Sequence, residues 1–166
     1  MSSILSEAVA SRFYDEWKAR FEDNWQKYIR PESRRVRRWS RRVENMCQAC
    51  DTGRPIDAWD YVYENVEYRL SKKWKTPNET IRSGIGDCED VTFLLASIFP
   101  AMGVDTHQIV LGEIIFPDGK SEFHTWNEYQ GMVIDATGTP ESTDMIQYIP
   151  EQKWEISLRP DKVDND

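Results

Sequence analysis

The 166-residue chain predicts an α+β domain in which helices come first and an antiparallel sheet follows. Up to about residue 103, apolar side chains recur three and four positions apart, which is the spacing of one helix face. From residue 107 onward, β-branched and apolar runs alternate with short turns, as is typical of antiparallel strands. This order of elements favours helices that pack together against one sheet.

Two long helices are expected at the start of the chain. The first covers residues 4–29, where Trp17, Phe21 and Trp25 follow one another at steps of four, and Pro31 ends it. It either packs in the core or forms an arm that binds a partner. The second begins near Pro31, and the face opposite its apolar residues is basic. That face carries Arg34, Arg35, Arg37, Arg38, Arg41 and Arg42.

This basic helix, residues 32–50, has two interpretations. It is a solvated surface paired with the acidic remainder of a chain whose formal charge is −8. Alternatively, it docks to an acidic partner, a nucleic acid or an anionic membrane surface. The overall negative charge argues against generic nucleic-acid binding, but the sequence does not separate the two interpretations.

Cys47 and Cys50 form a C-x-x-C pair at the end of the basic helix. A zinc site would need two more ligands, and a redox pair favours a strand-to-helix context that is missing here. Coincidence or core packing is the first interpretation; a redox pair or disulfide and a metal site stay open.

Three further helical segments are expected. The third helix runs over residues 56–70, again at three-and-four spacing. A short helix then follows Thr76, a plausible cap with Glu79 three residues later. A final helix begins at Cys88 and stops near residue 103.

The rest of the chain predicts a small sheet. Strands are expected at residues 107–116, 121–129 and 131–136, with His107 an ordinary surface or hydrogen-bonded histidine. Residues 138–150 resemble a loop, Trp154 to Leu158 an edge strand, and residues 161–166 a frayed tail.

Length predicts a single domain over residues 1–166, divided into a helical extension (1–54), a core (55–138) and a C-terminal part (139–166). The first residues lack the basic and long apolar regions of a signal peptide. No run approaches the roughly 18 apolar residues that span a bilayer. We therefore expect a cytoplasmic protein without a transmembrane segment.

Cys88 is the candidate nucleophile because it lies in the first turn of its helix. Unpaired backbone N–H groups and the positive end of the helix dipole favour a thiolate there, and the Cys88 N–H could hold an oxyanion. His124 and Asp135 follow on consecutive predicted strands. This order suits a nucleophile, a base and a group that orients the base.

The acidic neighbours of Cys88 oppose this chemistry. Asp87, Glu89 and Asp90 should raise the pKa of the thiol, because negative charge disfavours a thiolate. The helix dipole and His124 must therefore outweigh these carboxylates, or another group must neutralise them.

The motifs around these residues resemble the transglutaminase-like superfamily, in particular the bacterial transglutaminase-like cysteine proteinases. They are Gly86-Asp87-Cys88-Glu89-Asp90, His124-Thr125-Trp126 and Asp135-Ala136-Thr137, with the lead-in from Trp74 to Ile81. The resemblance covers about residues 60 to 138. It implies a papain-like core with the nucleophile helix packed on an antiparallel sheet.

The resemblance implies a cysteine peptidase or amidase that acts on a protein or peptide through a thioester, with Cys88, His124 and Asp135 as its triad. One alternative is transglutaminase-type transfer to an amine, because both activities use this triad. The other is a non-catalytic module that keeps the fold and docks through the basic helix.

Four further residues have candidate roles. Trp74 is a possible second oxyanion donor from its position in the resembled motif, and Trp126 a candidate substrate-binding residue. Asp87 and Asp90 correspond to acids that some of the proteinases use to bind Ca²⁺. These acids could instead cap the helix and pair with nearby arginines, and no cofactor is otherwise required.

Overall fold

The computed structural model describes residues 14–46 and 54–157. Residues 14–24 form the described part of a first helix, which continues as the 3-10 helix η1 (Trp25–Tyr28). The following helices are α2 (Arg34–Met46), α3 (Pro55–Asn65), α4 (Pro77–Ser83), α5 (Cys88–Ala101) and the short α6 (Pro140–Thr143). Among these residues, no helix has both the length and the apolar character needed to cross a bilayer.

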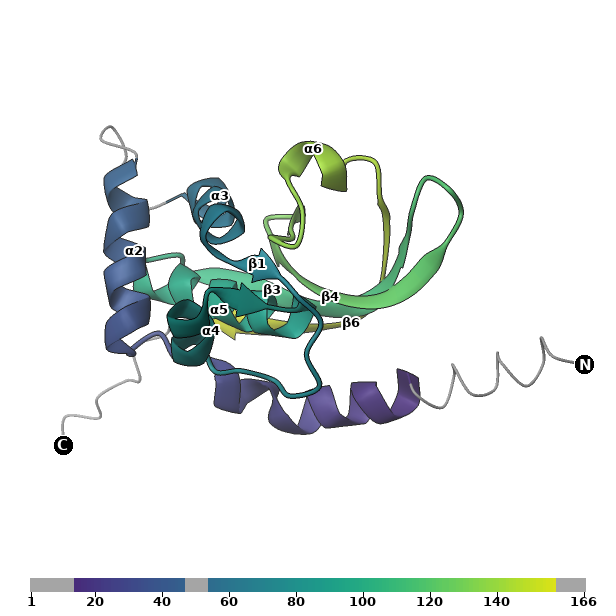
Figure 1. Ribbon diagram of the computed structural model, residues 1–166, viewed down its shortest axis with the longest axis horizontal. Helices are drawn as coiled ribbons and strands as arrows, with labels where there is room; N and C mark the ends of the chain where they lie inside the picture. The colour runs from purple at the N-terminus through teal and green to yellow at the C-terminus, as the bar shows by residue number, and fades with distance from the viewer. Residues whose placement is uncertain (1–13, 47–53, 158–166) are drawn as a thin grey trace, which may run out of the picture.

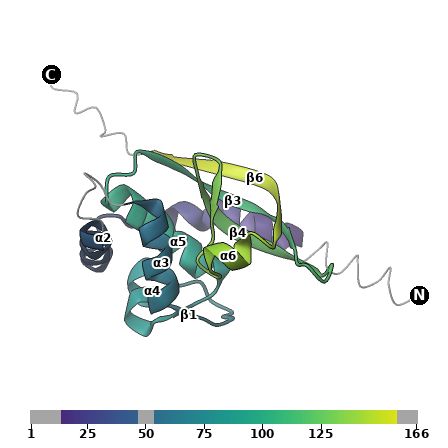
Figure 2. The ribbon, with the colours of Figure 1, turned by 90° about the horizontal axis from the view of Figure 1, so that it is seen from above.

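The sheet has four antiparallel strands in the order β5-β4-β3-β6. They are β3 (Thr106–Ile115), β4 (Ser121–Tyr129), β5 (Met132–Ile134) and β6 (Gln147–Ser157). Helices α3, α4 and α5 gather on one side of this layer (Figure 2). Helices followed by an antiparallel sheet confirm the predicted α+β class.

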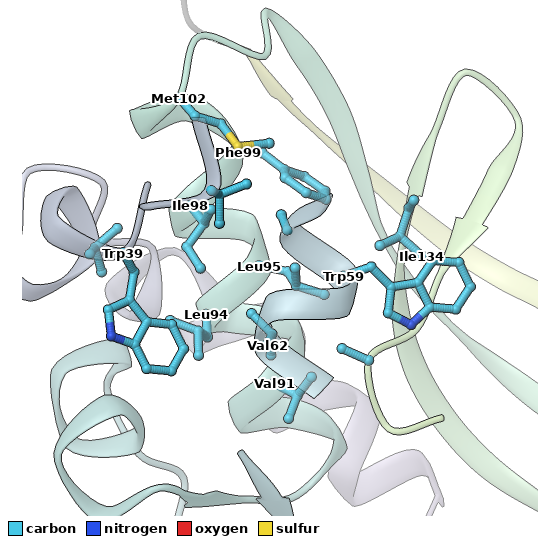
Figure 3. Packing of buried hydrophobic residues seen from close by; sticks show 14 of the residues in the cluster. Trp39, Trp59, Val62, Val91, Leu94, Leu95, Ile98, Phe99, Met102 and Ile134 are labelled. Atoms are coloured by element: carbon cyan, nitrogen blue, oxygen red, sulfur yellow. The ribbon is translucent and has the colours of Figure 1, made fainter. Parts of the chain in front are cut away.

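Helix α5 is the centre of the molecule and contacts both α2 and the sheet (Figure 1). Its side chains are apolar almost all round, and those from Val91 to Pro100 are all buried, as expected for a helix enclosed on every side. Figure 3 shows Leu94 and Ile98 on the side of Trp39 from α2, while Trp59 of α3 lies beside Ile134 of β5. The first residue of this rigid helix is Cys88.

The predicted cap of α4 is confirmed, and the start of α5 is capped by its acidic residues. Thr76 caps α4, and Glu79 completes the predicted capping box. Asp87 caps α5 in the same way with Asp90, so the carboxylates beside the cysteine hold the start of its helix.

The predicted third helix is too long. It ends at Asn65, and Leu70, which should have lain on its buried face, is 82% exposed. Residues Glu67–Tyr68 instead form strand β1, which pairs in parallel with β2 (Ile85–Gly86). This pairing, which the helical spacing could not reveal, draws residues 67–71 towards the start of α5.

The last strand is longer than predicted. The Ile149-Pro150 sequence suggested a loop, but β6 begins at Gln147 and passes through both residues. The strand accommodates Pro150 at a shift of register opposite Leu111 and Gly112, a position where proline is tolerated. A Cβ atom on Gly112 would lie 2.1 Å from the Ile149 carbonyl oxygen, so only glycine fits this crossing.

The first helix packs in the core, which confirms the first of its two interpretations. Phe21 is fully buried and stacks on Phe93 of α5 and Trp154 of β6. The predictions for residues 4–13, for Cys47 and Cys50, and for residues 158–166 lie outside the described residues. The division into one domain with three parts stays a prediction.

Candidate active site

Cys88, His124 and Asp135 come together where the start of α5 meets β4 and the end of β5. Cys88 opens α5, His124 lies within β4, and Asp135 directly follows β5. Strands β4 and β5 are paired antiparallel, so their register brings the histidine and the aspartate to the same place. Cys88 and His124 both line a pocket of about 270 Å³. Their catalytic roles stay predictions.

His124 and Asp135 form a buried hydrogen-bonded pair. His124 Nε2 lies 2.8 Å from Asp135 Oδ2. Burial alone would lower the pKa of His124, but the charge of Asp135 and this hydrogen bond raise it above its ordinary value. Because Nε2 is engaged, Nδ1 is the ring nitrogen that can exchange a proton with a thiol.

Asp135 is held in place by two further residues. Tyr148 donates its hydroxyl hydrogen to Oδ2 at 2.7 Å, while Thr137 donates its hydroxyl and backbone hydrogens to Oδ1 at 2.7 and 3.2 Å. Burial would raise the pKa of Asp135, but the charge of His124 and these hydrogen bonds lower it. Asp135 therefore remains a carboxylate despite being buried.

The Cys88 thiol hydrogen-bonds to Glu89. Sγ donates to Glu89 Oε2 at 3.1 Å, and the Trp17 indole donates to the other Glu89 oxygen at 2.6 Å. The pKa of the Cys88 thiol is raised well above its ordinary value by burial first, then by Glu89 and Asp87, while a backbone hydrogen bond from Thr125 lowers it. Burial and the flanking carboxylates together therefore disfavour the thiolate in this arrangement.

Asp87 and Asp90 were expected either to bind calcium or to cap the helix. Asp90 is fully buried, and its oxygens accept hydrogen bonds from the Asp87 backbone N–H and from the backbone N–H and ammonium group of Lys75. Asp87 Oδ1 accepts the Asp90 N–H. These bonds match the capping interpretation, with a lysine in place of the expected arginines.

The same contacts do not fit a calcium site. Ca²⁺ takes six to eight oxygen ligands, whereas no group of three or more His, Cys, Asp or Glu side chains within residues 14–46 and 54–157 could hold a metal. The pKa of Asp87 is raised to about 8 by burial and by the charges of Glu89 and Asp90.

The two tryptophans with predicted roles lie away from the thiol pocket. Trp74 is buried among Phe21, Tyr28 and Phe93, and its indole does not line the pocket that holds Cys88. Its role as an oxyanion donor stays a prediction. Trp126 is 0% exposed and stacks beside His124, which leaves it no surface for a substrate contact. Trp126 instead lies roughly parallel to the imidazole, with ring centroids 6.2 Å apart.

Sequence reasoning missed three residues of the site. The spacing of Trp17 predicts a core position, and Tyr148 lies in the segment that resembles a loop, yet both hydrogen-bond to residues of the site. Tyr68, expected in a helix, lines the thiol pocket from β1. The polar ends of these aromatic side chains were the one available signal, because a buried indole N–H or phenol hydroxyl usually has a partner.

His107 differs from its prediction. It is 2% exposed, lies edge-on to Phe99, and neither ring nitrogen has a hydrogen-bond partner in the described part of the chain. Burial lowers its pKa to about 4. It lines a cavity of about 800 Å³, which contains none of the predicted catalytic residues.

The six arginines of the basic helix are all exposed. Arg42 donates to the hydroxyl group of Tyr61 at 3.0 Å, but none of the six forms an ion pair with a residue that the structure describes. The described contacts therefore give no support to pairing with the acidic remainder of the chain.

Comparison with known proteins identifies a family and a similar solved structure. The family model for the transglutaminase-like superfamily matches residues 38–140, more than half of the chain. No curated protein sequence matches. The crystal structure of a candidate cysteine protease from Cytophaga hutchinsonii aligns with a TM-score of 0.48 and 14% sequence identity. The alignment covers 81% of this chain and 54% of that protein, so the chain spans about half the length of this structural neighbour.

Proposed function

Because this chain belongs to the transglutaminase-like superfamily, we propose that it is a cysteine-dependent peptidase or amidase. The observation that carries the proposal is the buried His124–Asp135 hydrogen bond beside the pocket that holds Cys88. Such a pair orients an imidazole and stabilises its protonated form, which a cysteine nucleophile requires.

In the proposed reaction, the Cys88 sulfur attacks the carbonyl carbon of an amide while His124 accepts the thiol proton. In this proposal the backbone N–H of Cys88, at the N-terminus of α5, stabilises the oxyanion. The carbon–nitrogen bond then breaks, and the His124 imidazolium gives its proton to the leaving amine. A thioester remains on Cys88.

Water completes the cycle. His124 takes a proton from the water, whose oxygen attacks the thioester carbon, and the sulfur leaves and recovers a proton. Asp135 stays ionised throughout, because its oxygens accept hydrogen bonds from His124, Tyr148 and Thr137. If a primary amine replaces the water, the same residues carry out transglutaminase-type transfer.

The thiol must change partners before it reacts. It donates to Glu89 in this structure, so its proton has to pass to His124 when a substrate arrives. Substrate that displaces water from the pocket and separates Glu89 from the thiol would favour this exchange. The resting site is therefore proposed to be only weakly nucleophilic.

The experiment compares wild-type protein with Cys88→Ala on a proteome-derived peptide library, with and without the primary amine cadaverine. We expect new peptide termini from the wild type alone, and cadaverine adducts only if acyl transfer competes with hydrolysis. Full cleavage by Cys88→Ala would falsify the proposal. Iodoacetamide labelling provides a second measurement. The His124→Ala change should alter the labelling rate of Cys88 and leave the labelling rates of Cys47 and Cys50 unchanged.

A second candidate function is a non-catalytic docking module. The observation in its favour is the exposed arginine face of α2, which has no ion pair among the described residues. An acidic partner or an anionic surface would suit that face. This function predicts that His124→Ala has no effect on the labelling rate of Cys88 and that no peptide is cleaved.

A further inference from the structure

A second cavity adjoins the candidate active site on the side of the imidazole. Its volume is about 420 Å³, within the range of about 300–1,000 Å³ that is usual for ligand sites. Apolar side chains from the β3–β4 hairpin and from the segment after α6 form much of its wall. They are Ile114, Phe116, Pro117, Met145 and Ile146.

This apolar cavity and the thiol pocket meet at His124. His124 and Asp135 line the apolar cavity, while Cys88 lines only the thiol pocket. The residues common to both are Tyr68, Glu122 and His124. The order along the site is therefore the thiol, then the imidazole, then the apolar cavity.

The chemistry of the proposed reaction determines which part of the substrate lies on each side of the imidazole. In the proposed reaction, the acyl part of the substrate becomes bonded to the Cys88 sulfur, and the amine part receives its proton from His124. The amine must therefore leave on the imidazole side. The side chain that the amine carries then lies next to the apolar cavity.

The lining decides which side chain fits. Met145 lines the cavity and is 67% exposed, so a substrate side chain seated there would cover apolar surface that is now in contact with solvent. Glu122 is a carboxylate on the shared wall, and the oxygens of Asp135 already accept hydrogen bonds within the protein. An acidic side chain would meet repulsion from Glu122 and would find no hydrogen-bond donor in either carboxylate, while an apolar one would be removed from water.

We propose that the apolar cavity binds the side chain of the residue following the scissile amide bond and selects a large apolar residue there. The proposal rests on the proposed function and adds to it the class of leaving amine. Met145 is the specificity-determining residue that it identifies.

Peptide-library cleavage tests the proposal, with the residue after each cut read from the new N-termini. We expect leucine, isoleucine, phenylalanine and methionine to exceed glycine at that position by about 10-fold or more in kcat/KM. Met145→Lys should remove this preference and admit aspartate and glutamate. Met132→Lys is the matched control, because Met132 is 42% exposed and lines a neighbouring cavity that lacks Met145, Cys88, His124 and Asp135 and shares only Thr143 and Ile146 with this one.

A binding measurement keeps the test independent of catalysis. Leucinamide, which has the free amine and side chain of an apolar leaving group, is titrated into methyl-labelled Cys88→Ala protein and compared with glycinamide. We expect leucinamide to shift the Met145 methyl resonance, with glycinamide about 10-fold weaker and Met132 unmoved.

The outcomes separate the two proposals. Absence of cleavage by the wild type overturns the peptidase function, while the leucinamide titration still decides what the cavity binds. Cleavage with no apolar preference after the cut, or equal response of Met145 to leucinamide and glycinamide, overturns the assignment of the cavity.

Discussion

The Trp17 indole N–H donates a hydrogen bond to Glu89 at 2.6 Å, across 72 positions of sequence. The second oxygen of Glu89 accepts the hydrogen of the Cys88 thiol. The first helix of the chain therefore holds a carboxylate against the candidate nucleophile. Burial is the largest cause of the raised pKa of Cys88, and Glu89 raises it further, which lowers the reactivity of the resting thiol.

Replacing Glu89 by glutamine should make Cys88 more reactive. The change removes a negative charge that opposes the thiolate, so the pKa of the thiol falls and more thiolate is present at neutral pH. We expect the rate of iodoacetamide labelling at pH 7.5 to rise several-fold. The control is Glu141→Gln, which makes the same charge change at an exposed position on α6 and should leave the rate unaltered.

Trp17→Phe tests whether the first helix acts through Glu89. Phenylalanine keeps an aromatic ring beside Phe21 but cannot donate to Glu89, which is then able to turn towards water. Labelling of Cys88 should accelerate, though less than in Glu89→Gln. The double variant should label at the rate of Glu89→Gln alone, and additive effects would show that Trp17 acts by another route.

Asp135→Asn should disable the imidazole without disturbing the fold. Burial lowers the pKa of His124, so without the charge of Asp135 the pKa should fall instead of rise. We expect kcat to drop by roughly 10³- to 10⁴-fold, as when a triad histidine loses its orienting carboxylate. An NMR titration of His124 provides the independent measurement, and an unchanged pKa would contradict the assigned partner.

Asp90→Asn separates the capping interpretation from the calcium interpretation. The substitution leaves the Lys75 ammonium without its buried carboxylate, which should cost about 3 kcal/mol of unfolding free energy. Urea denaturation measures this loss. Addition of Ca²⁺ or EDTA should leave the Tm of the wild type unchanged, whereas a calcium-dependent rise in Tm that Asp90→Asn abolishes would restore the metal site.

His107 should make the fold sensitive to acid. Burial lowers the pKa of His107 to about 4 in the folded protein, whereas the ordinary value, which applies to the unfolded chain, is 6.5. Folding therefore favours the neutral ring. The stabilisation is complete above pH 6.5 and is lost as the pH falls to 4, by about 3 kcal/mol. His107→Leu cannot titrate, so urea denaturation at pH 7 and pH 4 should show the wild type losing this much more than the variant.

The sequence predicted the helices and strands well wherever one face is consistently apolar. The spacing in α2 and α5 and the β-branched run of β3 are local properties, and each identified its element within a few residues. The predictions for α3 and β6 had the wrong bounds for a common reason. Residues 67–68 and 147–150 extend only because they hydrogen-bond to strands elsewhere in the chain.

The sequence predicts those parts of the candidate site that short local motifs identify. Cys88, His124 and Asp135 were chosen from their local motifs, and the fold places them at one site. The contacts that shift the pKa values of these residues were not predictable. Tyr148 and Trp17 reach the site from opposite ends of the chain, and nothing in their own segments marks them as its neighbours.

The sequence by itself determined the family, the α+β class and the three residues that could form a triad, because motifs and periodicity are properties of short segments. Only the tertiary structure decided the protonation of the thiol and which side of the imidazole holds an apolar cavity. A pKa depends on burial and on charges that are near in space. A cavity likewise exists only once the β3–β4 hairpin and the segment after α6 close around His124.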